Sequence, residues 1–257
     1  QVGCPLDCAF CATGTMGFTR NLTAGEIVEQ FLHAQRQTSR RISNLVYMGM
    51  GEPMLNYENV MRSVDLLTDD RGPNIGARHI TISTAGYADQ IRRMADEHRR
   101  VKLALSLHAL DESKRTALIP ITRKHGIAAL TDALDYYYRR TRMRPTLEYI
   151  PFAGFNDTNA DADLLIRFSR RVPCKVNLIP FHSIAFTAPT GFAATLRPSS
   201  PDRIEEFANR LRAANLTVMV RSSAGEDIEA ACGQLAVADS PSPARRTARQ
   251  PQRSVAP

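Results

Sequence analysis

The sequence predicts an α/β fold built on a parallel β-sheet, either a closed or partial (β/α) barrel or an open doubly wound sheet. Short, apolar, β-branched runs alternate along the chain with longer amphipathic stretches. Each pair repeats after roughly 30 residues, which fits βαβ units. Because the short runs are mainly apolar, they are typical of strands buried on both faces of a parallel sheet.

Six strands and six helices follow from this pattern. The predicted strands cover residues 44–48, 79–83, 102–106, 146–150, 175–179 and 216–220. The predicted helices cover residues 23–37, 56–67, 87–98, 127–138, 161–170 and 201–214. The first helix has Thr23 as its N-cap and Glu26 three residues later, which is the pattern of a capping box.

The ends of these strands carry a set of candidate ligand-binding residues. They are Gly51 and Glu52, Ser83, the run Ser106, Leu107 and His108, and Asn177 inside an apolar strand. In barrels and doubly wound sheets alike, the active site lies at this carboxyl edge. Simpler explanations exist for each: an exposed glutamate in an ordinary turn, hydroxyls that cap the next helix, and an asparagine that belongs to a buried polar network.

The composition is that of a globular protein with a core, since 43% of the 257 residues are hydrophobic and 23% are charged. The net charge of +7 permits a nucleic-acid partner, although a solvated basic surface explains it equally well. Residues 1–237 are predicted to form one core domain. The segment 238–257, which is rich in Pro, Ser and Arg, is predicted to be a disordered basic tail.

Cysteine usage points to a reducing, intracellular compartment. The count of five is odd, and three cysteines fall within the first eleven residues, unlike a secreted disulfide framework. No signal peptide opens the sequence and no apolar run has transmembrane length. We therefore expect no membrane association.

The strongest motif is the spacing of Cys4, Cys8 and Cys11. Three thiolates on one short loop can hold a [4Fe–4S] cluster and leave its fourth iron open to an amino and a carboxylate group of a ligand such as S-adenosylmethionine (SAM). The alternatives are three unrelated buried cysteines or a zinc site that lacks its fourth ligand. Phe10, next to the last cysteine, suits an aromatic side chain that shields such a cluster. Cys174 and Cys232 are single cysteines, which are most often small buried hydrophobes.

Taken together, these motifs resemble the RlmN/Cfr family of radical SAM RNA methyltransferases, and the RlmN branch in particular. The resemblance runs from residue 1 to about residue 235. The segments that carry it are residues 1–11, 17–23, 49–53, 82–86, 106–109, 175–180 and 230–235. Residues 20–22 and 231–235 distinguish this family from other radical SAM enzymes.

The resemblance implies a partial (β/α)6 TIM-like radical SAM barrel with the cluster at its carboxyl face. It implies a [4Fe–4S] cluster on Cys4, Cys8 and Cys11 and two SAM molecules per turnover. It places SAM contacts at Gly51, Glu52, Ser83, Ser106, Leu107, His108 and Asn177, and assigns Cys232 as the catalytic, methyl-carrying cysteine. One SAM methylates that thiolate, and a second, cleaved at the cluster, activates the methyl group for addition to C2 of adenine.

The expected partners are RNA, namely 23S rRNA with tRNA as a second candidate, and an electron donor such as flavodoxin or ferredoxin. We expect a monomer located in the cytoplasm, or in an organelle if the source is eukaryotic. The resemblance also places a first barrel strand, an accessory domain and a resolving cysteine upstream of Gln1, so this chain should bind cluster and SAM but turn over poorly on RNA. Two alternatives stay open: a C8-specific or other radical SAM enzyme, and a noncatalytic iron–sulfur or zinc protein that binds RNA.

Overall fold

The computed structural model describes residues 1–221, so the segment that contains Cys232 lies outside the described residues. Its centre is a sheet of six parallel strands whose order in space is their order in the chain. The strands are β3 (Leu45–Tyr47), β4 (Ile80–Thr84), β5 (Lys102–Ser106), β6 (Thr146–Tyr149), β7 (Lys175–Leu178) and β8 (Thr217–Val220). All six predicted strands are confirmed.

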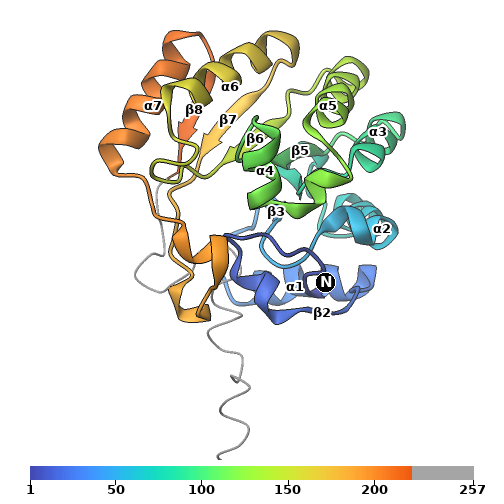
Figure 1. The fold of residues 1–257 in the computed structure, drawn as a ribbon. Helices are drawn as coiled ribbons and strands as arrows, with labels where there is room; N and C mark the ends of the chain where they lie inside the picture. Colours follow the sequence, from blue (N-terminus) through green and yellow to red (C-terminus); the bar gives the residue numbers. More distant parts are fainter. Residues whose placement is uncertain (222–257) are drawn as a thin grey trace, which may run out of the picture.

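Within residues 1–221, seven α-helices accompany the sheet, and most of them lie along its outer side (Figure 1). They are α1 (Ala24–Arg36), α2 (Tyr57–Thr68), α3 (Ala88–Asp96), α4 (Glu112–Leu118), α5 (Ile127–Thr141), α6 (Asn159–Arg171) and α7 (Pro201–Ala213). Six of them confirm predicted helices. The helix α4 was not predicted from the sequence.

The described sheet is open, because β3 and β8 are its two edges and do not pair with each other. Strands that follow one another in space and in sequence, joined by helices on the outer side, form the wall of a partial (β/α) barrel. This arrangement confirms the predicted fold class. No helix within residues 1–221 is long and apolar enough to cross a membrane.

Local sequence signals explain where helices begin. The Thr23 hydroxyl accepts a hydrogen bond from the Glu26 amide, and the Glu26 side chain accepts one from the Thr23 amide. This is the predicted capping box, and Thr158 with Asp161 forms a second one at the start of α6. Such caps satisfy amides that have no partner within the helix.

Two buried clusters divide the interior. The larger joins the sheet to its helices and includes Ile82, Leu105, Leu147 and Val176 from four successive strands. The smaller cluster lies beyond the strand ends and contains Ala12, Ala85, Leu118, Ile119, Phe152, Phe181, Ile184 and Leu196. Residues of the cysteine loop pack against this second cluster, so the loop is fastened to the carboxyl edge of the sheet.

A short antiparallel hairpin carries that loop. Its strands are β1 (Val2–Gly3) and β2 (Phe18–Arg20), and a 3-10 helix, η1 (Ala12–Met16), follows the last cysteine. Further single turns of 3-10 helix are η2 (Pro53–Asn56), η3 (Ala77–His79), η4 (Pro120–Arg123), η5 (Ala185–Thr187) and η6 (Gly191–Thr195). The first of these, η2, connects the end of β3 to α2 and contributes to the site.

Candidate active site at the carboxyl edge of the sheet

The cysteine loop is held by backbone hydrogen bonds on both sides. The Cys4 amide donates to the Gly17 carbonyl at 2.9 Å, and the Cys11 amide donates to the Cys8 carbonyl at 3.0 Å. The Ala9 amide, in the middle of the loop, donates to the carbonyl of Leu118 at 3.0 Å. The three cysteines therefore sit on a loop of defined shape, and all three are free thiols that are partly buried.

The thiols lie close enough to influence one another electrostatically. Burial raises the pKa of Cys8 well above its ordinary value, and the charges of Cys11 and Cys4 raise it further. Burial is also the main cause that raises the pKa of Cys4, to which Cys11 adds. Thiolates that disfavour each other in this way are stabilised together only by a nearby cation, which is what cluster irons supply.

The residues present fit such a cluster. Within residues 1–221, no three His, Cys, Asp or Glu side chains converge as ligands of a single metal ion do. A [4Fe–4S] cluster makes a different demand, because each thiolate binds its own iron. In the same loop the Thr13 hydroxyl is fully buried and has no hydrogen-bond partner among the described residues. Phe10, within the loop, packs edge-on against the His108 ring, with 4.6 Å between ring centroids.

Glu52 joins the ends of β3 and β4. Its side chain is only 2% exposed, so the alternative of an exposed glutamate in an ordinary turn is wrong. One carboxylate oxygen accepts from the Met54 amide at 2.9 Å, and the other accepts from the Ala85 amide at 2.7 Å. Burial raises the pKa of Glu52 to about 7 even though these amides oppose the shift. A cationic ligand group would favour the ionised carboxylate.

The turn that carries Glu52 is tied to the hairpin of the cysteine loop. The Gln1 side-chain oxygen accepts from the Glu52 amide at 2.7 Å, and the Gly3 amide donates to the Met50 sulfur at 3.4 Å. Gly51 has a φ of +89°, and a Cβ there would lie 2.7 Å from the Gln1 side chain. A glycine is therefore required for this close approach.

His108 presents one defined ring nitrogen. Its ring is 2% exposed, and the Ile150 amide donates to Nδ1 at 3.0 Å, so the proton of the neutral ring is on Nε2. Burial lowers the pKa of His108 to about 3, and the charge of Arg115 adds to this shift. The residue adopts a φ of +56°, and its carbonyl accepts from the Asn156 side chain at 2.6 Å. The imidazole is thus a fixed, neutral hydrogen-bond donor.

The adjoining residues Ser106 and Leu107 contribute through their backbone. Both carbonyls accept from the guanidinium of Arg115, at 3.1 Å and 3.2 Å respectively. Ser83 is a buried hydroxyl in β4, and its neighbour Thr84 accepts from the Gly86 amide at 3.0 Å. The predicted residues on β4 and β5 therefore meet at one edge, as parallel strands require.

Asn177 belongs to a partly buried polar pair. Its amide nitrogen donates to Glu148 on the neighbouring strand β6, at 2.7 Å. Burial raises the pKa of Glu148, and the bond from Asn177 opposes this effect. This bond fixes the orientation of the amide, and the Asn177 side-chain oxygen can accept from a ligand.

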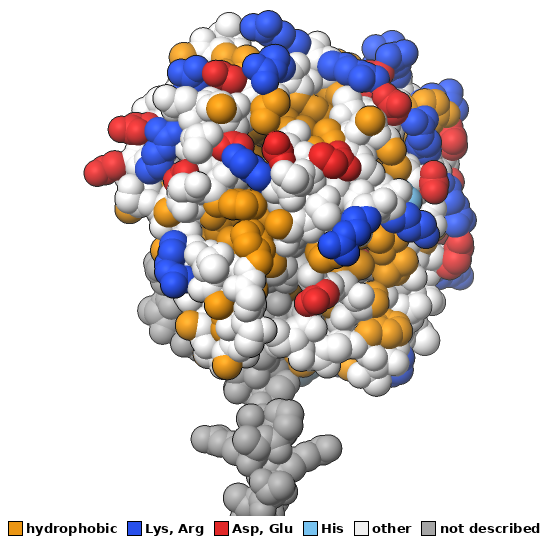
Figure 2. Space-filling model, viewed as in Figure 1, with side chains coloured by type: hydrophobic (Ala, Val, Ile, Leu, Met, Phe, Trp, Pro, Cys, Tyr) orange, Lys and Arg blue, Asp and Glu red, His pale blue; other side chains and the backbone are white. Residues whose placement is uncertain are grey.

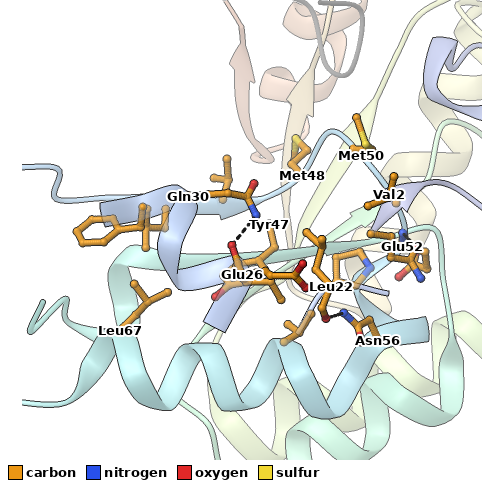
Figure 3. A pocket seen from close by; sticks show the side chains of 18 of the residues that line it. Val2, Leu22, Glu26, Gln30, Tyr47, Met48, Met50, Glu52, Asn56 and Leu67 are labelled. Carbon is orange, nitrogen blue, oxygen red and sulfur yellow. Dashed lines mark hydrogen bonds between the residues drawn. The ribbon is translucent and has the colours of Figure 1, made fainter. Parts of the chain in front are cut away.

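A cavity of about 670 Å³ runs along the outer edge of β3, between α1 and α2. Figure 3 shows Val2, Met50 and Glu52 at one end of this pocket and Leu67 at the other. Apart from Glu26 and Glu52, its lining carries no charged side chains within the described residues. Glu52 therefore lies where this apolar groove meets the carboxyl edge of the sheet.

Two residues of the site were not predicted from the sequence, Arg115 and Glu148. Both are charged residues within short elements, and a charged residue is ordinarily assigned to the surface. Glu148 could have been noticed from its position inside a largely apolar strand, whereas Arg115 stands in a polar segment that offers no such signal. Cys232, the predicted catalytic cysteine, lies outside the described residues.

Comparison with known proteins identifies the architecture. The Radical SAM superfamily model matches residues 1–167. The dual-specificity RNA methyltransferase RlmN of Anaeromyxobacter sp. (strain Fw109-5) is 44% identical over 98% of this chain and 67% of its own length. The crystal structure of a radical SAM methyltransferase from Sphaerobacter thermophilus superposes with a TM-score of 0.83, at 46% identity over 91% of this chain and 67% of that one.

A more distant structure shows the shared fold alone. Streptococcus suis SuiB, in a structure bound to SAM, is 15% identical and superposes with a TM-score of 0.59 over 86% of this chain and 48% of its own. The chain spans about two thirds of the length of the curated relatives it matches. The cysteine loop, the partial barrel and an identity of 41–46% to proteins named RlmN agree with one another, and they place this chain in the RlmN family of the radical SAM superfamily.

Proposed function

We propose that this protein methylates C2 of an adenosine in RNA, with 23S rRNA as the first candidate substrate and tRNA as the second. The observation that carries the proposal is the fastening of a three-thiol loop to the sheet edge that holds Glu52 and His108. When bound on Cys4, Cys8 and Cys11, the cluster supplies the single electron that cleaves SAM. The family to which the chain belongs supports RNA methylation as the outcome.

The side chains at the edge have complementary roles toward SAM. Glu52 accepts from two backbone amides and keeps further lone pairs, so it suits the ammonium group of the methionine moiety. His108 offers a neutral Nε2–H, and Asn177 offers its side-chain oxygen, so each suits a complementary polar group of the nucleoside or carboxylate. Gly51 allows the backbone of the turn to come close to the ligand.

Cys232 is proposed as the residue that carries the methyl group. Methylation of C2 requires a carbon donor other than SAM itself, because C2 of adenine is electrophilic and does not attack a methyl cation donor. A Cys232→Ala variant should still release 5′-deoxyadenosine from SAM and reductant, and it should fail to methylate RNA. Cys174→Ala, which changes a buried cysteine immediately before β7, is the matched control and should retain both activities.

The proposed partners are the RNA substrate and a low-potential one-electron donor such as flavodoxin or ferredoxin. The monomeric state and the cytoplasmic location stay predictions. Figure 2 shows Lys and Arg side chains scattered over one face with Asp and Glu between them, so this face has no single basic patch. We propose that the chain binds the cluster and SAM and methylates RNA.

The deciding experiment is anaerobic reconstitution followed by mass spectrometry. The expected results are a brown protein, release of 5′-deoxyadenosine, and 2-methyladenosine in a 23S rRNA fragment. An 8-methyladenosine product would favour the C8 alternative instead. Failure to bind iron or to cleave SAM would refute the enzyme assignment and leave a noncatalytic RNA-binding protein.

A further inference from the structure

Arg115, in the middle of α4, is a fully buried arginine. None of its surface is exposed, and it is the largest of the fully buried side chains. Its guanidinium donates to the carbonyl of Ala85 at 2.6 Å and to the hydroxyl of Thr122 at 2.6 Å. It also donates to the carbonyls of Ser106 and Leu107. All the hydrogen-bond partners that it has among residues 1–221 are neutral.

This distinguishes Arg115 from its basic neighbour in the chain. Lys114 pairs with the buried carboxylate of Asp161 at 2.7 Å. The carboxylate of Glu112, one turn before Arg115, instead accepts from the Ile127 amide at 3.0 Å. Burial lowers the pKa of Arg115 to about 10, which expresses the cost of this charge, and the charge of Glu112 opposes the shift only in part. A buried charge is costly unless an opposite charge balances it.

The position of Arg115 places its charge next to the cysteine loop. Its carbonyl partners lie at the ends of β4 and β5, beside the predicted SAM contacts. The last residue of its helix, Leu118, accepts the hydrogen bond from Ala9 in the middle of the cysteine loop. Ala85, whose carbonyl accepts from the guanidinium, and Leu118 both belong to the buried cluster against which Cys8 packs.

We propose that Arg115 is the fixed counter-charge of the cluster that Cys4, Cys8 and Cys11 hold, and that it raises the reduction potential of this cluster. The inference rests on the cluster site of the proposed function. Three thiolates outweigh the positive charge of an oxidised cluster, and reduction adds one electron from the low-potential donor. A nearby cation stabilises the reduced form more than the oxidised form, because the reduced form carries one more negative charge.

The test is an EPR-monitored redox titration of the reconstituted protein. Arg115→Met removes the charge, and it should lower the equilibrium constant for reduction at least about tenfold, which is 59 mV for a one-electron couple. Arg115→Lys keeps the charge and should change the equilibrium constant for reduction less than about threefold. Iron content and far-UV circular dichroism show whether each variant folds and carries its cluster.

A second pair of variants leaves the arginine in place, in case its removal prevents folding. Thr122→Asp sets a carboxylate where the hydroxyl contacts the guanidinium, so the charge is neutralised in place, and the potential should fall as it does in Arg115→Met. Thr122→Asn has a similar shape and no charge, and should leave the potential unchanged.

The outcomes separate the two levels of the proposal. Equal potentials in wild type, Arg115→Met and Thr122→Asp would overturn the role of Arg115 while the cluster site stands. Equal shifts in Thr122→Asp and Thr122→Asn would show a packing effect and would also overturn it. A wild-type protein that binds no iron would refute the cluster site and, with it, this inference.

Discussion

Replacing Glu52 by glutamine should flatten the dependence of stability on pH in the cluster-free protein. The pKa of Glu52 is raised from 4.5 to about 7, with burial as the main cause. Between these two values the unfolded chain releases the proton while the folded protein keeps it. The free energy of unfolding therefore falls as the pH rises through this window, and it is constant with respect to this group above and below it.

The magnitude follows from the size of the window. At 1.36 kcal/mol per pH unit, a pKa raised from 4.5 to about 7 corresponds to a loss of about 3 kcal/mol. Chemical denaturation at several pH values from 4 to 8 measures it. The wild-type curve should fall by about 3 kcal/mol more than the Glu52→Gln curve over this range. Glu29→Gln, which removes an exposed carboxylate, is the control for the loss of one charge. Parallel curves for wild type and Glu52→Gln would refute the buried-carboxylate argument.

Three further variants test other parts of the site. Cys8→Ala should abolish iron binding while Cys174→Ala retains it, as measured by iron content after reconstitution. Glu148→Ala frees the Asn177 amide and should weaken SAM binding about tenfold in calorimetry, which corresponds to the loss of roughly one hydrogen bond. Glu148→Gln can still accept from the amide and should bind SAM within about twofold of wild type. Gly86→Ala meets a φ of +116° and a Leu130 carbon 2.9 Å from the new Cβ, so it should lower the free energy of unfolding by about 1–3 kcal/mol.

The strands and the longer helices were predictable because each has a strong local signal. Ile80, Ile82, Leu103 and Leu105 lie in short, mainly apolar runs, which are typical of strands buried on both faces. A capping box marked the start of α1 at Thr23. The ends of parallel strands lie at one edge, so the prediction that Glu52 and His108 share that edge followed from topology.

The helix α4 and the pair of Glu148 with Asn177 were not predictable in the same way. The buried face of α4 consists of Arg115 and Leu118, so a charged side chain occupies the place where an apolar residue would reveal the helix. Glu148 stands in an apolar strand, and its partner Asn177 comes from the next strand in the sheet. A contact between two distant segments does not change the hydrophobic periodicity of either segment, so only the folded structure reveals it.

The buried charges at the carboxyl edge share one physical logic. Glu52 and Glu148 are buried acids whose pKa values are raised, and Arg115 is a buried base whose pKa is lowered. Burial opposes the charged form of all three, and their hydrogen bonds run to backbone groups and neutral side chains. Groups held in this way destabilise the folded protein on their own. Binding of a ligand with the complementary charge stabilises it. A cluster with anionic thiolates complements Arg115, and the ammonium of SAM complements Glu52. We therefore expect cluster and SAM together to raise the thermal stability of the protein by more than either does alone. Each ligand balances a different buried charge at the same edge of the sheet.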